Sequence, residues 1–301
     1  MKSFLPVLAQ RLLDENSVLF IVGPTGVGKS AMAVDAAECS GGEIISCDAL
    51  QVYREVNIAS DKPSKSLRER AAHHLIDVVS VTEDFNAAKF CTLAVAAIEE
   101  ITRRGRKPIF CGGSGMYMMA LLDGLFDSVE IPDGIRESLL AKVVIGGLPE
   151  LYQRLQSVDP VAAGRIDSHD QQRIVRALEV FEATGTPISL LQRQRNGLWG
   201  KMPIGIVGLT RRREELYARA EARIEMMFSS GLVEEIRDLS RYELSVNVSR
   251  LIGVREVQGY INGEYDLNRA KELMKLNTRH YIKRQLTWFR RDQRVKWVEL
   301  S

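Results

Sequence analysis

The stretch VLFIVGPTGVGKSAMAVDAA, residues 18–37, decides the fold of this chain. Its first five residues, 18–22, form an uninterrupted apolar run, which is typical of a strand buried on both faces of a parallel sheet. Residues 23–30, GPTGVGKS, fit the pattern G-x-x-x-x-G-K-[ST], and a helical stretch follows at 31–37. A strand, a glycine-rich loop and a helix in this order predict a phosphate-binding P-loop.

Each part of this loop suits a phosphate or diphosphate group. The glycines let backbone N–H groups approach phosphate oxygens, Lys29 adds a positive charge, and the Ser30 hydroxyl can hold Mg²⁺. The predicted phosphate-binding residues are Gly23, Pro24, Thr25, Gly26, Val27, Gly28, Lys29 and Ser30, with Ser30 as the metal ligand. The motif alone leaves open whether the phosphate belongs to a nucleotide such as ATP and whether a phosphoryl group is transferred.

Strand and helix signals alternate through the first half of the chain. Strands are predicted at 43–46, 75–79 and 108–111, and Asn86 is a suitable cap for a helix at 87–104. The pattern is helical from about 118 to 200, a strand-like run returns at 204–209, and helical stretches follow at 213–239 and 268–293. We therefore predict an α/β fold with a P-loop NTPase-like parallel sheet core (1–117 and 201–301) and a helical insertion domain at 118–200.

The composition is that of an ordinary globular protein with an uneven distribution of charge. Of 301 residues, 45% are hydrophobic and 27% charged, which excludes disordered, collagen-like and disulfide-rich classes. Residues 1–150 contain 15 basic against 20 acidic residues, and the remainder 26 against 19, although the whole chain is only +2. The basic half can bind nucleic acid, or it can be a solvated surface.

The cysteines and the apolar segments indicate the compartment. Cys39, Cys47, Cys91 and Cys111 show no C-x-x-C or zinc-ligand spacing, so we expect buried thiols in a reducing environment. The N-terminal residues lack the pattern of a signal peptide, and no apolar run is long enough to span a membrane. We expect a cytoplasmic protein with no membrane partner.

Three further segments carry candidate functional residues. Asp48 follows the second predicted strand, where a carboxylate can act as a general base or cap a helix. Residues 112–117, GGSGMY, form a second glycine-rich corner, in which Ser114 can donate to an anion. Cationic and aromatic side chains at 278–291 suit either nucleic-acid contacts or a solvated helix face.

Together these motifs resemble those of the tRNA dimethylallyltransferase family. The matching segments are GPTGVGKS at 23–30, DALQVY at 48–53, DKP at 61–63, HHLID at 73–77, GGSGMY at 112–117, QRIVRALEVFEATG at 172–185 and KRQLTWFRRD at 283–292. The chain departs from the usual family pattern at GVGKS in place of ASGK[ST], at Ala49 in place of Ser, at SDKP in place of GTAKP, and at GGSGMY in place of GGTGLY.

The resemblance implies a particular transfer reaction. A dimethylallyl group would pass from dimethylallyl diphosphate to N6 of the adenine 3′ to the anticodon, in tRNAs reading codons that begin with U. The P-loop would then hold the diphosphate of the prenyl donor, together with Mg²⁺. By the same resemblance Asp48 takes the N6 proton and Arg213 faces the leaving diphosphate, with Thr25, Ser114 and Arg136 near the reacting centre.

The resemblance also implies that the partner is the anticodon stem-loop of tRNA and that the protein is a monomer. The target base must leave the loop stack before it can react. The expected tRNA contacts are Asp48, Ala49, Leu50 and Gln51; Gln172, Arg173, Ile174, Val175 and Arg176; Arg250 and Arg255; and Lys283, Arg284, Gln285, Trp288 and Arg290.

Three other functions share parts of the pattern. A P-loop kinase of small metabolites would not need the basic second half or the Arg- and Trp-rich last helix. A prenyltransferase acting on free AMP or ADP would not need a large basic insertion. An RNA-binding protein with a vestigial phosphate site would not need a carboxylate such as Asp48 at the sheet edge.

Overall fold

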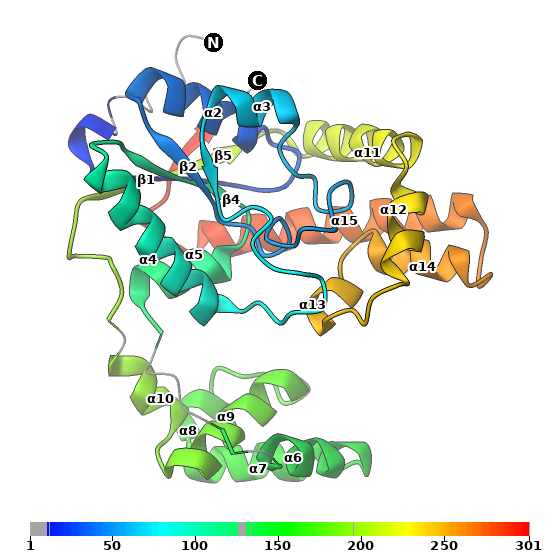
Figure 1. Ribbon diagram of the computed structural model, residues 1–301. Coiled ribbons are helices and arrows are strands. Elements are labelled where there is room, and N and C mark those ends of the chain that lie inside the picture. The colour runs from blue at the N-terminus through cyan, green and yellow to red at the C-terminus, as the bar shows by residue number, and fades with distance from the viewer. Residues whose placement is uncertain (1–10, 12, 126–130, 133, 195, 301) are drawn as a thin grey trace. The chain divides into compact units, whose positions relative to one another are not determined.

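The computed structural model describes residues 11, 13–125, 131–132, 134–194 and 196–300, and it divides the chain into two compact units (Figure 1). The core unit comprises residues 1–120 and 199–301, and the helical unit comprises residues 121–198. These boundaries lie close to the insertion predicted at 118–200.

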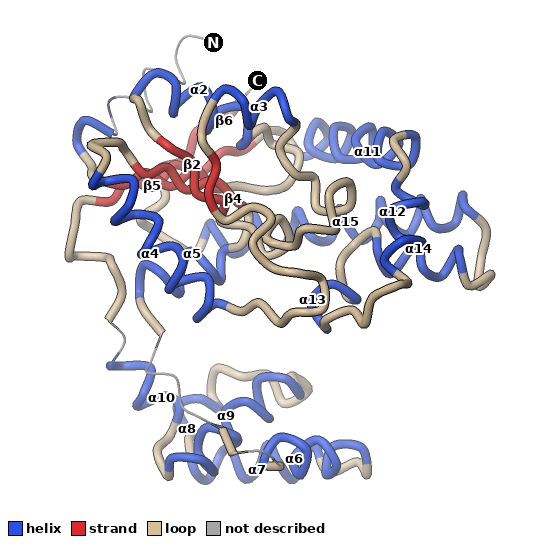
Figure 2. The backbone as a smooth tube through the Cα atoms, in the orientation of Figure 1, coloured by secondary structure: helices blue, strands red, loops and turns tan. Residues whose placement is uncertain are grey.

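The core unit is built on a six-stranded parallel sheet (Figure 2). The strand order is β3-β2-β4-β1-β5-β6, as expected for an α/β P-loop fold. The strands are β1 (Val18–Val22), β2 (Glu43–Ser46), β3 (His73–His74), β4 (Pro108–Gly112), β5 (Ile204–Thr210) and β6 (Lys296–Glu299). Because all strands run in the same direction, the loops that follow β1, β2 and β4 leave from the same edge of the sheet.

Strand β1 is covered on both faces, which explains its uninterrupted apolar sequence. Leu19 and Ile21 pack in one cluster with Ala33 of α2 (Lys29–Ser40). On the alternate face the Phe20 ring stacks on Phe110 with centroids 4.4 Å apart. Burial of this strand between two layers supplies much of the hydrophobic free energy of the core unit.

The remaining helices of the core unit surround the sheet or continue from its carboxyl edge. They are α3 (Lys65–Arg70), α4 (Ala87–Arg103), α5 (Gly115–Asp123, which continues past the unit boundary), α11 (Arg213–Ser229), α12 (Leu232–Leu239), α13 (Val246–Ser249), α14 (Val254–Ile261) and α15 (Leu267–Arg290). Helix α4 begins as predicted, because the Asn86 side chain accepts the Lys89 N–H at 3.0 Å. No helix of the described residues is long and apolar enough to cross a membrane.

The helical unit has a core of its own. Its helices are α6 (Ile135–Val144), α7 (Leu148–Val158), α8 (Pro160–Ala163), α9 (Gln171–Thr184) and α10 (Ile188–Leu191), followed by a 3₁₀ turn at Gln192–Gln194. Leu151 and Leu155 of α7 pack against Ile174 and Leu178 of α9. This packing follows the apolar spacing of three and four residues along each helix.

Four local predictions were wrong or incomplete. The strand expected at 75–79 is displaced to β3, because Leu75 and Asp77 have left-handed backbones with φ 60. The helix expected at 213–239 is two helices, since Gly231 adopts φ 98 between α11 and α12. No strand was predicted at β6, whose two end residues Lys296 and Glu299 are exposed, and Cys39 is exposed where a buried thiol was expected.

Candidate active site

A cavity of about 470 Å³ in the core unit lies against the carboxyl edge of the sheet. Its volume is within the range of small-molecule sites. Of the residues predicted from sequence, its wall contains Thr25, Gly26, Gly28, Lys29, Ser30, Asp48, Ala49, Leu50, Gln51, Ser114, Arg250, Arg284 and Gln285. The fold therefore brings the P-loop, the segment after β2, the second glycine corner and helix α15 into one wall.

The P-loop is fixed by contacts from β5 and α11. Gly23 has φ 145, and a Cβ at this position would lie 2.6 Å from the carbonyl oxygen of Leu209, so glycine is required. Arg219 Nε donates to the Gly26 carbonyl at 2.8 Å, and Arg211 Nε donates to the Val27 carbonyl at 3.1 Å. The loop is thus held in shape by the protein itself.

Three members of the motif do not line the cavity. Gly23 and Pro24 are buried, and the Val27 side chain packs in the core beside β1 and α2. Their contribution to anion binding is limited to the backbone conformation that they impose.

Lys29 is held over the loop that precedes it. Its Nζ donates to the Pro24 carbonyl at 2.9 Å. Burial lowers the pKa of Lys29, while the nearby charge of Asp48 acts in the opposite direction. A cation that is partly removed from water interacts more strongly with an anion that enters the cavity than an exposed one does.

Asp48 lies directly after β2, half-buried in the cavity wall. Its Oδ1 accepts the Leu50 N–H at 2.9 Å. Burial raises the pKa of Asp48 above the ordinary carboxyl value, and the bond from Leu50 and the charge of Lys29 oppose that rise. A raised pKa makes the carboxylate a better proton acceptor than an exposed aspartate.

The second glycine corner is attached to the end of β2. The Ser114 N–H donates to the Cys47 carbonyl at 3.2 Å, and the Ala49 N–H donates to Ser114 Oγ at 3.0 Å. Because Ser114 Oγ accepts this bond, its own proton stays available to a ligand. These contacts hold Ser114 beside the residue that follows Asp48.

Gln51 is held from two directions. Its Oε1 accepts the Ser46 hydroxyl proton at 2.9 Å, and its Nε2 donates to the Asp61 carbonyl at 3.2 Å. The side chain that the family resemblance places against the target nucleotide is therefore oriented by the sheet edge and by the loop at 57–63.

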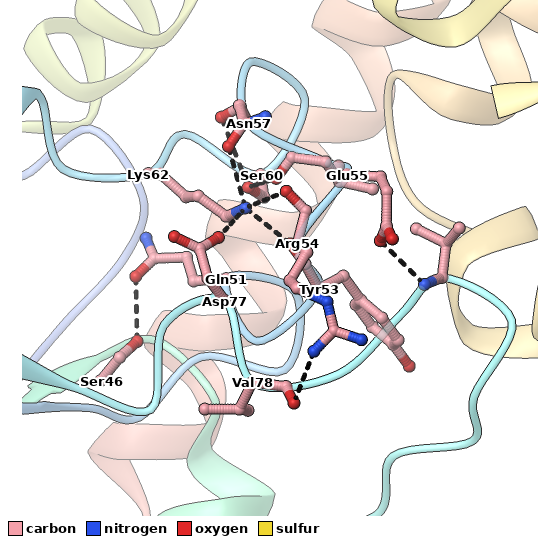
Figure 3. Close-up of polar contacts among 12 residues, drawn as sticks. Ser46, Gln51, Tyr53, Arg54, Glu55, Asn57, Ser60, Lys62, Asp77 and Val78 are labelled. Carbon is pink, nitrogen blue, oxygen red and sulfur yellow. Dashed lines mark hydrogen bonds and ion pairs between the residues drawn. The ribbon is translucent and has the colours of Figure 1, made fainter. Parts of the chain in front are cut away.

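Lys62, in the DKP segment, organises the loop after Asp48 (Figure 3). Its side chain is 3% exposed and forms an ion pair with Asp77 at 2.6 Å. Lys62 Nζ also donates to the Tyr53 and Arg54 carbonyls at 2.6 and 3.2 Å and to Asn57 Oδ1 at 3.0 Å. The DKP motif was recognised from the sequence, but no role was predicted for Lys62.

The arginine predicted beside the diphosphate lies outside the cavity wall. Arg213 is exposed in the first turn of α11 and does not line the cavity. Arg219 and Arg223 of the same helix do line it, and Arg223 forms an ion pair with Asp61. Their spacing of four residues puts both on one helix face, a signal that was available in the sequence.

Helix α15 contributes both buried and exposed polar groups. Gln285 is 5% exposed and bonded to the two glycine corners, so its side-chain amide is already engaged at a position where a contact with tRNA was predicted. Lys283, Arg284 and Arg290 are exposed, and Trp288 is 38% exposed. The Arg284 guanidinium lies 5.7 Å from the centroid of the Tyr281 ring, also in the cavity wall.

Comparison with known proteins decides the family. The model of the IPP transferase family matches residues 51–292. A tRNA dimethylallyltransferase from Geobacter metallireducens is 43% identical over 288 residues, covering 95% of this chain and 93% of that protein. The chain belongs to the tRNA dimethylallyltransferase family.

Solved structures of tRNA prenyltransferases share the fold. The tRNA isopentenylpyrophosphate transferase of Bacillus halodurans has a TM-score of 0.69 and 34% identity, with 94% of this chain and 90% of that chain covered. A eukaryotic dimethylallyltransferase acting on tRNA has a TM-score of 0.80 and 27% identity, with coverage of 94% and 73%.

In this family member, the segment predicted from QRIVR is only partly available to RNA. Ile174 and Val175 are buried in the core of the helical unit, so their side chains are not available at its surface. Gln172 and Arg173 are exposed on α9, and Arg176 is half-buried. The polar residues of the segment thus face outward, and its two apolar residues face the core of the helical unit.

Two predicted cations of the helical unit share one buried acid. Arg136 donates to Glu179 Oε1 at 2.8 Å, and Arg176 donates to Glu179 Oε2 at 3.3 Å. In the core unit, Arg250 lines the cavity, whereas Arg255 is exposed and pairs with Glu256 at 3.1 Å. Arg136, for which a catalytic role was predicted, thus forms an ion pair with Glu179 within the helical unit.

Proposed function

We propose that this protein transfers a dimethylallyl group from dimethylallyl diphosphate to N6 of the adenine 3′ to the anticodon, in tRNAs that read codons beginning with U. Family membership supports the reaction class. The observation that carries the proposal is one cavity in which Asp48, with its raised pKa, lies in the same wall as the P-loop and Lys29. The site thus combines a proton acceptor with a diphosphate-binding loop.

The transfer requires removal of a proton from N6 and departure of the diphosphate. The N6 lone pair of adenine is delocalised into the ring, so the amine is a weak nucleophile. As the bond from N6 to the allylic carbon forms and the bond from that carbon to the diphosphate oxygen breaks, Asp48 takes the N6 proton. The electron pair of the broken bond leaves with the diphosphate.

Positive groups stabilise the departing diphosphate. We assign this role to Lys29, the P-loop amides and Arg219, with Arg219 in the place expected for Arg213. The hydroxyl groups of Thr25 and Ser114 line the same wall and can donate to the diphosphate or the leaving oxygen.

A magnesium ion fits this donor set. Ser30 lines the cavity in the first turn of α2, and no group of three His, Cys, Asp or Glu side chains suitable for a metal occurs among the described residues. Mg²⁺ commonly takes few protein ligands and completes its shell with phosphate oxygens and water. Bound there, it would neutralise diphosphate charge, with Ser30 as the protein ligand.

We assign tRNA binding to exposed cations and to the segment after β2. The candidate contacts that remain are Asp48, Ala49, Leu50 and Gln51 in the cavity wall, Gln172, Arg173 and Arg176 on α9, Arg250 and Arg255, and Lys283, Arg284, Trp288 and Arg290 on α15. Gln51 grips the flipped adenosine, because its side chain is already oriented. We further propose that the protein acts as a monomer, which light scattering tests.

One assay tests the proposed reaction. Unmodified tRNA, labelled dimethylallyl diphosphate and Mg²⁺ are incubated with the protein, and the RNA is digested and searched for N6-dimethylallyladenosine. We expect transfer to tRNA by the wild type and a rate about a hundredfold or more lower with Asp48→Asn. Transfer to AMP but not to tRNA would favour a free-nucleotide prenyltransferase, and ATP consumption with a small acceptor would favour a kinase.

A further inference from the structure

One buried side-chain amide joins the two glycine-rich corners of the site. Gln285 Oε1 accepts the Thr25 N–H of the P-loop at 2.9 Å. Gln285 Nε2 donates to the Gly113 carbonyl oxygen at 3.0 Å. The residue is 5% exposed; its bond to Gly113 is buried and its bond to Thr25 is partly buried.

The chemistry of these two bonds selects an amide. The Thr25 N–H needs an oxygen acceptor, and the Gly113 carbonyl needs an N–H donor. A glutamate would lack the donor, and a methionine of similar length would lack both groups. A buried donor or acceptor that loses its partner retains the full cost of desolvation.

Gly113 is adapted to the same contact. A Cβ at Gly113 would lie 2.1 Å from Gln285 Nε2, whereas the next non-Gln285 atom is 3.5 Å away. The backbone at Gly113 does not have a left-handed φ, so the close approach of the Gln285 side chain is what opposes a Cβ at this position.

The contact connects distant parts of the chain at the reacting centre. Thr25 and Gly113 follow the neighbouring strands β1 and β4, and Gln285 reaches them from α15. Ser114, the next residue after Gly113, accepts the Ala49 N–H beside Asp48. The Gln285 amide therefore helps to set the distance between the P-loop and Asp48.

We propose that Gln285 is a positioning residue. It fixes the relative positions of the P-loop and the second glycine corner, between which the prenyl donor binds. This inference rests on the proposed function. It separates Gln285 from its exposed neighbours Lys283 and Arg284, which remain candidate tRNA contacts. Because both polar atoms of its amide already bond to Thr25 and Gly113, we assign Gln285 no direct bond to either substrate.

Gln285→Met tests this role by removing both bonds while nearly conserving length. We expect KM for dimethylallyl diphosphate to rise and kcat to fall, each by about tenfold. The affinity for tRNA without donor, and its salt dependence, should stay within about twofold. Lys283→Met, on the exposed face of the same helix, should instead lower the affinity for tRNA and weaken its salt dependence. Its KM for dimethylallyl diphosphate should be unchanged.

A double-mutant cycle provides a test that does not depend on one variant folding well. Gly113→Ala alone forces the Gln285 side chain aside and should impair donor binding. In a Gln285→Ala background the same change has room, so the two losses should be strongly non-additive. Additive losses would overturn the coupling between Gly113 and Gln285.

The outcomes distinguish this inference from the proposed function. If the wild-type protein transfers no dimethylallyl group, the proposed function fails. If the wild type is active and Gln285→Met loses tRNA affinity with an unchanged KM for the donor, Gln285 is an RNA contact and the positioning role fails. Wild-type kinetics in both Gln285→Met and Gln285→Glu would also overturn it.

Discussion

Lys62 and Asp77 form an ion pair of 2.6 Å in which the lysine side chain is almost fully buried and the carboxylate is 36% exposed. The lysine also bonds the Tyr53 and Arg54 carbonyls, so it ties the segment after Asp48 to residue 77. The same segment carries Gln51, which donates to the Asp61 carbonyl next to Lys62. A residue outside the cavity wall therefore supports the side of the site assigned to the adenine.

Lys62→Met should loosen this segment, because four oxygen atoms lose a shared donor. We expect kcat/KM for tRNA to fall by about tenfold or more, and the melting temperature to drop by several degrees. Steady-state kinetics and thermal unfolding measure the two effects. Lys65→Met is the matched control, since Lys65 is exposed on α3 and should change neither. An unaltered kcat/KM in Lys62→Met would contradict the supporting role.

Asp48→Asn should abolish proton transfer while conserving shape. We expect kcat to fall by about a hundredfold or more, with tRNA affinity nearly retained. A large loss of affinity with residual turnover would instead make Asp48 mainly a binding residue.

The pH dependence follows from the direction of the Asp48 pKa shift. Burial raises the pKa of Asp48, and only the deprotonated carboxylate accepts a proton. The rate should therefore fall as the pH drops through this raised pKa, at a higher pH than for an ordinary aspartate. Single-turnover rates measured across acidic pH give this part of the pH–rate profile. The residual activity of Asp48→Asn should not show the same fall.

Arg219→Met and Arg213→Met form a matched pair on one helix. Arg219 lines the cavity and holds the Gly26 carbonyl, whereas Arg213 is exposed outside the wall. We expect Arg219→Met to lower kcat/KM for dimethylallyl diphosphate by about ten- to a hundredfold and Arg213→Met to have little effect. The reverse order would restore the assignment made from sequence.

Arg284→Ala should weaken tRNA binding by removing an exposed cation from α15. We expect the slope of log affinity against log salt to become shallower by about one. Filter binding over a range of salt concentrations measures this slope. An unchanged slope would show that Arg284 contacts no phosphate.

The local motifs were predictable because each depends on neighbouring residues. The P-loop at 23–30, strand β1 and the Asn86 helix cap follow from apolar runs, glycine spacing and side-chain capping within a few residues. Strand β6 and the turn at Leu75 and Asp77 were not predictable, since their conformations depend on pairing and packing with distant segments.

The roles of individual polar residues depended on tertiary contacts. Gln285 and Lys283 are two positions apart in one basic helix, yet one is buried against Thr25 and Gly113 and the other is exposed. Arg213 and Arg219 share α11, but only Arg219 reaches the cavity. Burial and distance to partners hundreds of residues away decide such differences, and no local pattern contains them.

The sequence by itself determined the α/β P-loop fold and the family, because periodicity and ordered motifs survive without knowledge of contacts. Only the tertiary structure decided which arginine faces the cavity, which glutamine is buried and that Lys62 organises the loop beyond Asp48. The physical reason is that a side chain's function depends on its desolvation and on the partners within hydrogen-bond reach, and the folded chain alone sets both.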